Sequence, residues 1–443
     1  MLLSLSFALL QSYSIEDLGT LSSDPNDLVE AAALDDHGHA VATVLDTTSF
    51  PFRERAFFWD DGLRTEILPS SGWEARAEDL NADDLVVGGI DQGSLLSSRS
   101  FVWQAGVITE FQVGSLAFSS ALGVNQDGWL AGRYQYATDP FTGLPIQDGY
   151  VRSPGGNDVL LAPLGSEGSE AVALNDFGVA VGWSTLYGVA GRIHAAVWTA
   201  PSPIPVDIDP NFGPRSYATD VDAWDRVVGG MADAQGNVQP FVWEAGAVTL
   251  LPTLGGAEGA VEAAADTGAL VGWAEDSNGV RRACSWEGGV PVALDALIAP
   301  GSGWTLTTAT DVNELGEIVG NGTLNGLPRA WKLTPVLAAP RISGLVPPAA
   351  GRTDRCFGLG FQPGATVHLV GSLQAGSTAV PGCAGLVVDL AAPTVLATPT
   401  ADADGRLEVA LTPPASLAGV TVHLQAVDLA ACVASDPVTH ALR

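Results

Sequence analysis

Histidine and cysteine are the residue types of this chain best suited to metal binding or nucleophilic chemistry, and there are six and four of them. His37 and His39 flank a glycine beside Asp35 and Asp36, an arrangement that could be drawn as a metal site, but a solvated turn explains the same residues. The other histidines have no HExxH or comparable ligand spacing, and no GxSxG motif provides a serine nucleophile. We therefore expect no metal, no cofactor and no catalytic residue.

Carboxylates are so numerous, with 50 Asp and Glu residues, that adjacent pairs carry little information. Turns explain Asp60 with Asp61 and Asp83 with Asp84. The DADG segment at Asp402 lacks the remaining ligands of a calcium loop and is interpreted as a hairpin turn. A glycosidase needs two carboxylates that converge in space, and the sequence singles out no such pair.

The four cysteines are divided between two parts of the chain. Cys284 precedes Trp286 at a position where other copies of a repeat hold alanine, phenylalanine or valine, so we expect a small buried side chain there. Cys356, Cys383 and Cys432 lie near the C-terminus, where three residues cannot all pair with one another. No CxxC spacing indicates a zinc site.

A repeat of about 46 residues organises the chain from residue 12 to residue 335. Its reference position, called here the turn residue, is preceded by an apolar residue and four places earlier by a small one. A Gly or Asp follows three places later, as the positive φ of a tight turn requires, and a strand glycine follows seven places later in six copies. The turn residues are Asp35, Asn81, Asn125, Asn175, Asp222, Ala265 and Asn313.

Each repeat also predicts a third strand that ends in an aromatic residue. That residue is tryptophan in six copies, whereas the third copy has Tyr150, Val151 and Arg152 instead. A unit of this length with four short strands is typical of a β-propeller blade, so we predict a seven-bladed propeller over residues 12–335. Because Ser12–Asp17 looks like the end of a blade, we expect it to complete the last one. The third-strand tryptophans are Trp59, Trp103, Trp198, Trp243, Trp286 and Trp331.

The segments outside the repeat have different compositions. Residues 1–11 begin with a short apolar run that fits the apolar part of a signal peptide without its basic start, with a buried first strand as the alternative. Residues 336–350 are proline-rich and predict a linker. Residues 351–443 show short alternating strands and turns, which predict a small C-terminal β-sandwich.

The charge balance excludes several partners. The formal net charge is −31, and Lys332 is the single lysine of the sequence. Such a chain is a poor partner for nucleic acid or an anionic membrane surface. No stretch of 18 apolar residues predicts a transmembrane helix.

The repeat resembles the bacterial extracellular HAF repeats. Residues 17–21 read DLGTL and residues 253–256 read TLGG, which match the first part of that family's consensus. Its later part runs roughly AxxNxxGxxVG, and residues 175–182 read NDFGVAVG. The C-terminal part, with PGCAG, TADADGR and LQAVDLAAC, is similar to a domain of secreted planctomycete proteins. This resemblance implies export, a disulfide between Cys383 and Cys432, and a free thiol at Cys356. It implies no catalytic residues.

These observations favour a secreted or surface-held, non-catalytic scaffold or binding protein, a monomer whose loops face a glycan or a protein partner. The alternative is a polysaccharide hydrolase or lyase. Two or more acidic side chains that converge with an aromatic residue in the central funnel would favour that alternative.

Overall fold

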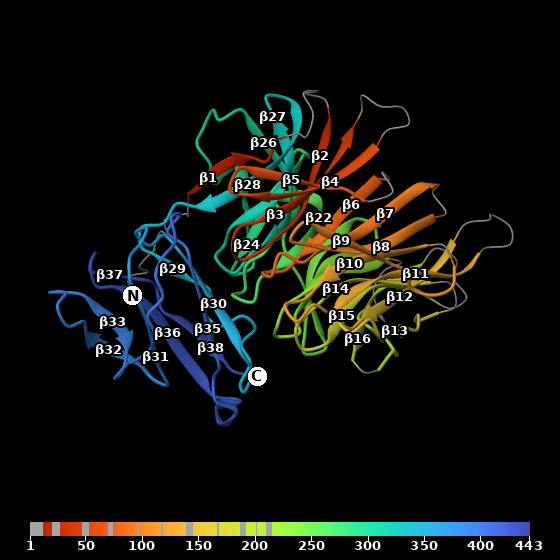
Figure 1. Cartoon of the computed structure of the whole chain (residues 1–443). Helices are drawn as coiled ribbons and strands as arrows, with labels where there is room; N and C mark the ends of the chain where they lie inside the picture. Colours follow the sequence, from red (N-terminus) through yellow and green to blue (C-terminus); the bar gives the residue numbers. More distant parts are fainter. Residues whose placement is uncertain are drawn as a thin grey trace.

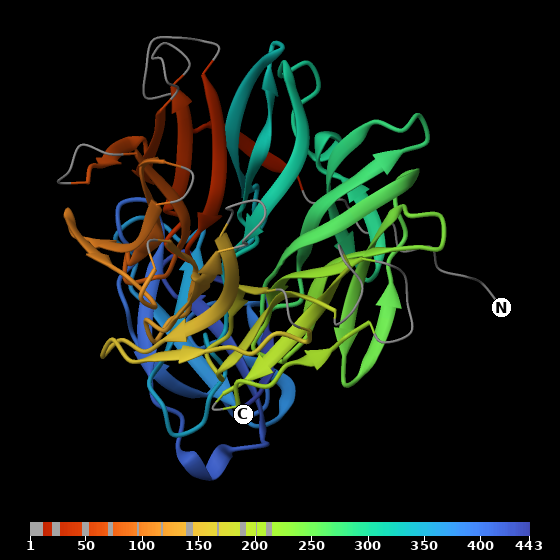
Figure 2. The ribbon, with the colours of Figure 1, turned by 90° about the vertical axis from the view of Figure 1, so that its right-hand side faces the viewer.

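The computed structural model describes residues 12–19, 27–46, 53–69, 74–94, 97–116, 118–138, 145–165, 168–186, 192–200, 202–209 and 215–443, so the predicted signal-peptide segment lies outside the described residues. Seven four-stranded antiparallel sheets surround a central axis, as predicted (Figures 1 and 2). The other described elements are a C-terminal group of strands and two short helical turns, η1 (Leu294–Leu297) and η2 (Ala415–Leu417). No described helix has the length and apolarity needed to cross a membrane.

The seven sheets are numbered here as blades 1 to 7 in chain order. Blade 1 contains β2 (Leu28–Leu34), β3 (Ala40–Asp46), β4 (Arg53–Asp60) and β5 (Leu63–Ile67). Blade 2 contains β6 (Glu74–Leu80), β7 (Val86–Ser94), β8 (Ser97–Gln104) and β9 (Val107–Phe111). Blade 3 contains β10 (Ser119–Val124), β11 (Leu130–Thr138), β12 (Pro145–Arg152) and β13 (Asp158–Leu160). Blade 4 contains β14 (Ser169–Leu174), β15 (Val179–Thr185), β16 (Ile193–Thr199) and β17 (Val206–Asp207).

The remaining blades follow the same order, with one exception at the end. Blade 5 contains β18 (Ser216–Val221), β19 (Val227–Ala232), β20 (Val238–Glu244) and β21 (Ala247–Leu250). Blade 6 contains β22 (Gly255–Ala264), β23 (Leu270–Asp276), β24 (Arg281–Glu287) and β25 (Val290–Ala293). Blade 7 combines β26 (Trp304–Val312), β27 (Ile318–Leu324) and β28 (Leu327–Pro335) with the N-terminal strand β1 (Tyr13–Asp17).

The N-terminal strand closes the ring, as the sequence predicts. β1 runs antiparallel to β28, with Tyr13 opposite Pro335 and Asp17 opposite Trp331. Just beyond β1, Leu18 is fully buried in the core of blade 1. The N-terminal segment therefore covers the edge of the last blade and also packs into the first.

A β-bulge interrupts the first strand of every blade. In blade 4 the bulge lies between Ala171 and Ala173, and Ala171 is opposite Gly182. A Cβ atom on Gly182 would lie 2.0 Å from the carbonyl oxygen of Glu170, so a side chain does not fit there. This close backbone approach explains the recurrent strand glycine and confirms its interpretation. The same bulge gives each blade one extra residue, called here the bulge residue, three places before the turn residue.

The turn residue joins neighbouring blades as well as forming the turn. Asn125 Oδ1 accepts hydrogen bonds from the backbone N–H groups of Asp127, at 3.1 Å, and Trp129, at 2.9 Å. Its Nδ2 donates to the carbonyl oxygen of Asn175 in the next blade, at 3.1 Å. One amide side chain therefore satisfies three backbone groups, which explains why asparagine recurs at this position.

The C-terminal strands form two sheets that share one apolar core. One sheet contains β29 (Arg341–Ile342), β30 (Asp354–Leu359) and β35 (Leu407–Leu411). The other contains β31 (Val367–Ser372), β34 (Thr394–Ala397), β36 (Thr421–Asp428), β37 (Val433–Ala434) and β38 (Val438–Ala441). A hairpin of β32 (Ala375–Ala379) and β33 (Val387–Leu390) is added to them. Residues 336–443 are called here the C-terminal unit.

The proline-rich segment 336–350 is not a free linker over its whole length. β29 lies within it and pairs with β30. Ile342 and Leu345 are buried in the core of the C-terminal unit. Pairing and burial therefore make this segment part of the C-terminal fold from Arg341 onward.

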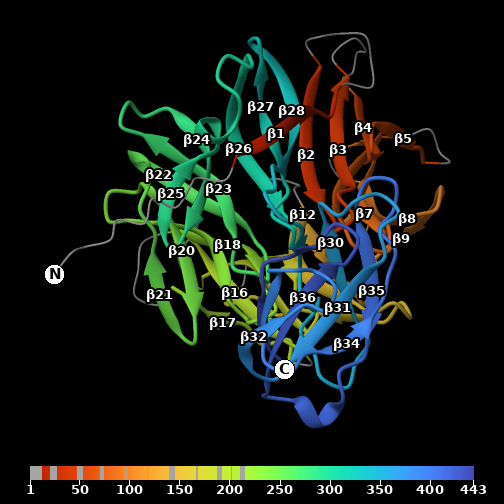
Figure 3. The same ribbon diagram turned by 90° about the vertical axis from the view of Figure 1, so that its left-hand side faces the viewer.

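The C-terminal unit docks on the face of the ring that carries the turn residues (Figures 1 and 3). All five of its arginines reach the ring, which its composition alone does not predict. Each contacts a carboxylate or backbone carbonyl near a turn of blade 2, 3, 5 or 7. With 50 acidic residues in the chain, this distribution places the scarce positive charge where it holds two acidic parts together. The arginines are Arg341, Arg352, Arg355, Arg406 and Arg443.

Cys383 and Cys432 form a disulfide in the structure, whereas Cys284 and Cys356 are buried free thiols. We expect loss of the disulfide to destabilise the C-terminal unit, because the closed loop is 49 residues long. Loops of this length correspond to about 4 kcal/mol in the chain-entropy description. Denaturant unfolding of a variant with serine at both positions should show the loss. A reductant should destabilise the unmodified protein and leave this variant unchanged; equal sensitivity of both would contradict the prediction.

Candidate functional site: the funnel opposite the C-terminal unit

A large cavity of the ring is a funnel at the end of the axis away from the turn residues. Its volume is about 660 Å³, and side chains from six of the seven blades line it. Every described residue that lines it belongs to the ring, since the C-terminal unit docks on the other face. Figure 2 views the ring from the side of this opening, with the C-terminal unit behind it.

The β-bulges determine which side chains line the funnel. In six blades the bulge residue is part of its wall. The residues directly opposite the strand glycines are small and packed, so they leave little freedom for variation. The bulge residue is outside the regular pairing and differs from blade to blade. The bulge residues in the wall are Ala32, Glu78, Val172, Thr219, Glu262 and Thr310.

Arg76 is the centre of the charged network in the funnel. Its guanidinium lies 3.0 Å from Glu78, 3.2 Å from Glu30 and 3.5 Å from Glu54, the last through Nη1. A planar guanidinium with five donors can hold several carboxylates at once, which an ammonium does less well. The network holds Glu30 and Glu78 in the wall, and the single positive charge of Arg76 offsets part of the negative charge of the three glutamates.

Two glutamates of the funnel have strongly perturbed acidity. Burial raises the pKa of Glu78 to about 7, although Arg76 and Arg133 oppose the shift. Burial also raises the pKa of Glu262 to about 7, against the opposing charge of Arg281. Glu262 accepts a hydrogen bond from Trp273 Nε1 at 3.0 Å, which orients its carboxyl group. Both groups therefore titrate near neutral pH, where a carboxylic acid can donate or accept a proton.

Two aromatic side chains, Trp183 and Tyr217, line the same funnel. Trp183 follows the strand glycine of blade 4, and Tyr217 precedes the paired alanine of blade 5. Aromatic faces beside fixed polar groups are suited to stacking against the apolar faces of a polar ligand. Acidic side chains and an aromatic residue in the central funnel were named from the sequence as the feature that would favour a hydrolase or lyase. Glu78, Glu262, Trp183 and Tyr217 do line one funnel.

Sequence reasoning missed the funnel residues because it followed what recurs. Glu78, Glu262 and Arg76 occupy positions that vary between copies, next to positions that do not. The available signal was that variability. A position that holds different residue types among the blades, between two packed positions, is free of the packing constraint. The β-bulge directs this variable side chain toward the axis, and the sequence of a single strand does not reveal a bulge.

The other end of the axis holds a second, smaller cavity of about 160 Å³, lined by turn residues, the residues that follow them, and Val346 of the C-terminal unit. Asp36, Asp266 and Glu314 lie there, and each accepts a backbone N–H bond from a neighbouring blade. Burial raises the pKa of all three carboxyl groups, and repulsion from neighbouring carboxylates, which is Asp35 in the case of Asp36, adds to the rise. These groups link blades, so we assign them a structural role.

We expect the protein to be more stable at pH 5 than at pH 8. Carboxyl groups with a raised pKa hold protons in the folded state that the unfolded chain has lost, so the free energy of unfolding falls as pH rises from about 4 to about 7. Asp79 is one further example, since burial raises its pKa to about 7. Thermal melts should show a shift of several degrees. Asp266→Asn keeps the acceptor for Ala223 N–H and should reduce the pH dependence; an unchanged slope would count against this origin.

The structure corrects one interpretation of the sequence. The segment with His37 and His39 is not a solvated turn: the two side chains are only 27% and 20% exposed, and Asp35 beside them is fully buried. The C-terminal unit covers the turn, with Phe357 edge-on to the His37 ring at 5.1 Å. Exposure was expected because nothing in the local sequence indicates that another part of the chain packs there.

The seven sheets and the docked sandwich define this protein as a β-propeller with a C-terminal β-sandwich unit. No protein-family model matches the sequence, and no curated protein matches it. The resemblance to HAF repeats and to the planctomycete domain therefore remains a prediction.

Several solved structures are similar in shape at low sequence identity. TolB from Acinetobacter baumannii has a TM-score of 0.39 at 10% identity, with 70% of this chain and 63% of that chain covered. The propeller domain of the trilobed protease from Pyrococcus furiosus has a TM-score of 0.36 at 10% identity, with 60% and 95% covered. Virginiamycin B lyase from Staphylococcus aureus has a TM-score of 0.34 at 11% identity, with 73% and 99% covered.

Proposed function

We propose that this protein is an extracellular binding protein whose funnel takes a neutral carbohydrate chain. The observation that carries the proposal is the lining of the funnel, which contains Trp183 and Tyr217 together with the fixed polar groups of Arg76 and its glutamates. Sugars combine apolar ring faces with hydroxyl groups that both donate and accept hydrogen bonds. An aromatic residue next to carboxylates and a guanidinium complements both features.

The charges in the funnel favour a neutral ligand over a strongly charged one. Glu30, Glu78 and Glu262 are balanced in part by Arg76 and Arg215 within the same wall. Arg76 already contacts three carboxylates, so an anionic ligand would have to displace one of them. A protein partner is the alternative given by the sequence, and such a partner would dock on the outer loops. It would not need the funnel side chains.

The disulfide supports an extracellular location. Disulfides form and persist mainly in oxidising compartments such as the periplasm and the extracellular space. Cys383 and Cys432 are joined, and a secreted or surface-held protein is therefore part of the proposal. We further propose that the chain is a monomer, because β1 covers the edge of the last blade.

The binding proposal is tested with a panel of neutral oligosaccharides and the full chain. Trp183→Ala should weaken binding by about tenfold or more, in keeping with the 1–3 kcal/mol expected for an aromatic stacking contact. Trp129→Ala is a matched control, since Trp129 is an exposed tryptophan on the turn face, next to turn residue Asn125. Binding should not change between low and high salt. Equal effects of the two variants, or a strong salt dependence, would overturn the proposal.

A hydrolase is the second candidate function, and one observation favours it. Glu78 and Glu262 line the same funnel, and both have a pKa of about 7, as a general acid requires. The same oligosaccharide panel distinguishes the two functions when product formation is measured. Turnover that Glu78→Gln or Glu262→Gln abolishes would replace the binding proposal with a catalytic one. Binding without turnover supports the non-catalytic proposal.

A further inference from the structure

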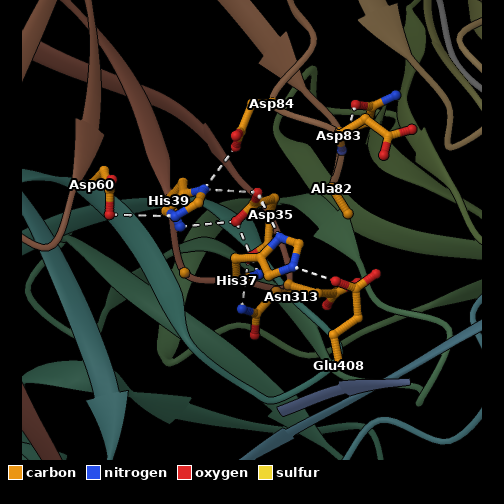
Figure 4. Close-up of polar contacts among 12 residues, drawn as sticks. Asp35, His37, His39, Asp60, Ala82, Asp83, Asp84, Asn313 and Glu408 are labelled. Atoms are coloured by element: carbon orange, nitrogen blue, oxygen red, sulfur yellow. Dashed lines mark hydrogen bonds and ion pairs between the residues drawn. The ribbon is translucent and has the colours of Figure 1, made fainter. Parts of the chain in front are cut away.

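The turn between β2 and β3 brings together three potential metal ligands on the face opposite the funnel. Asp35 Oδ2 lies 3.5 Å from His37 Nδ1 and 3.3 Å from His39 Nδ1. Ligand atoms from the three side chains all lie within 4.8 Å of one another. Figure 4 shows the two imidazole rings on either side of Asp35.

Two of these donor atoms are buried without a hydrogen-bond partner. Asp35 Oδ2 and His37 Nδ1 are both inaccessible and make no hydrogen bond of good geometry among the described residues, although Asp35 Oδ2 lies within ion-pair distance of both imidazoles. The Asp35 side chain has no exposed surface, so water does not compensate for the missing bond. A buried carboxylate oxygen normally has a partner, because leaving it without one costs free energy. A cation between the three side chains would provide that partner.

The distances match a zinc-like coordination shell. With Zn–N and Zn–O bonds of about 2.0–2.2 Å, the ligand atoms of a tetrahedral site lie about 3.3–3.5 Å apart. The two Asp35–histidine separations fall in that range. Asp84 Oδ1, from the turn of blade 2, lies 2.8 Å from His39 Nδ1, which is a hydrogen-bond distance and shorter than these separations. Asp84 therefore contacts the His39 ring without being one of the three ligands.

The outer nitrogens of both rings face carboxylates. His37 Nε2 lies 3.2 Å from Glu408 Oε2 of the C-terminal unit, and His39 Nε2 lies 3.4 Å from Asp60 Oδ1. Metal-binding histidines commonly donate the second ring N–H to a carboxylate, which fixes the tautomer and directs the other nitrogen to the metal. Phe58 also packs edge-on against the His39 ring at 5.2 Å and holds its orientation.

We propose that Asp35, His37 and His39 form a binding site for a divalent transition-metal ion of the zinc class. The ion would hold the turn of blade 1 together, and the turn of blade 2 contacts that site through the hydrogen bond between Asp84 and His39. Through Glu408 the ion would also fix the C-terminal unit against the ring, so its role is structural.

Blade 5 offers a matched variant for the test. Its turn residue Asp222 has Arg226 four places later, as Asp35 has His39, and Arg226 Nε lies 2.5 Å from Asp222 Oδ2. His39→Arg copies this natural pair, so it keeps a cation beside Asp35 and removes a metal ligand. His423→Gln, in the C-terminal unit, changes a histidine that instead contacts Thr439.

The experiment uses the untagged full chain, stripped with a chelator and titrated with Zn²⁺ by calorimetry. Excess Mg²⁺ is present to occupy surface carboxylates, since Mg²⁺ prefers oxygen ligands. We expect one tight equivalent, an increase in melting temperature on binding, and visible absorption bands of a low-symmetry site when Co²⁺ replaces Zn²⁺. His39→Arg should weaken binding by more than about 100-fold, and Glu408→Gln by about 10- to 100-fold, as for other partners of ligating histidines.

Several outcomes would overturn the site. These are the absence of a stoichiometric Zn²⁺ equivalent, unchanged affinity in His39→Arg, or an equal loss in His423→Gln. Tight binding of Ca²⁺ in place of Zn²⁺ would overturn the assignment of the metal class. Because His39→Arg keeps the ion pair with Asp35, its melting temperature without metal shows whether any loss of binding comes from misfolding.

Discussion

A chain that begins at residue 20 should melt on the order of 10 °C lower than one that begins at residue 12, and should self-associate. The shorter chain lacks β1, which pairs with β28 over five residues, and Leu18, which is fully buried in blade 1. Loss of one buried leucine side chain alone costs about 2–5 kcal/mol, and each kcal/mol corresponds to about 2–4 °C in a domain of 150–250 residues. The exposed edge of β28 is open to pairing with other chains.

The chain that begins at residue 12 is the control, because it keeps every described residue of β1. Thermal melting and size-exclusion chromatography of the two chains are the measurements. Equal melting temperatures and monomeric profiles would show that the pairing of β1 with β28 does not hold the ring closed.

Glu317→Gln should destabilise the protein by about 3–5 kcal/mol, because it leaves the buried Lys332 and the largely buried Arg406 without their counter-charge. The Glu317 carboxylate accepts two hydrogen bonds from Arg406, at 2.6 and 2.9 Å, and lies 3.4 Å from Lys332 Nζ. Glu317 has no exposed side-chain surface, and Lys332 is 2% exposed. Burial alone would raise the pKa of Glu317, but Lys332 and Arg406 lower it below its ordinary value.

The direction of that pKa shift defines the pH range in which the Glu317 carboxylate stabilises the folded protein. A carboxyl group with a lowered pKa contributes stability above its unfolded pKa and loses it as pH falls through the folded value. The effect of Glu317→Gln should therefore be full at pH 7 and should shrink only at acidic pH. The measurement is denaturant unfolding of the unmodified protein and of Glu317→Gln, each at pH 7 and at an acidic pH.

Glu66→Gln is the matched control for Glu317→Gln. Glu66 also accepts two hydrogen bonds from one arginine, Arg55, at 2.6 and 2.7 Å, but both side chains are partly exposed. An exposed pair of this geometry contributes about 1 kcal/mol or less. Similar losses in the two variants would contradict the argument from burial. If Glu317→Gln destabilises the C-terminal unit alone, the role of the contacts among Glu317, Lys332 and Arg406 would be limited to docking.

The ring could be predicted because its information is local and repeated. The turn residue Asn175, the turn Gly178 and the strand glycine Gly182 lie within eight residues, and each has a role within one hairpin. The further bond from Asn175 Nδ2 to the Asp222 carbonyl oxygen of the next blade is not apparent from one copy. Closure of the ring was also predictable, since the last copy lacks one strand and the N-terminal segment has the sequence pattern of that missing strand. The disulfide between Cys383 and Cys432 was implied by resemblance and not by spacing.

The chemistry of the molecule depends on contacts between parts that are distant in the sequence. Glu78 and Glu262 share a funnel because two bulges 184 residues apart (78 to 262) point to one axis. His37 is buried because Phe357 and Glu408 pack on it from the C-terminal unit. The sequence by itself determined the strands and the turns, since these depend on residues within one repeat. It also determined the closure of the ring, since the strand that the last repeat lacks is present at the N-terminus. Only the tertiary structure decided which variable side chains meet, because burial and charge pairing depend on neighbours that no single repeat contains.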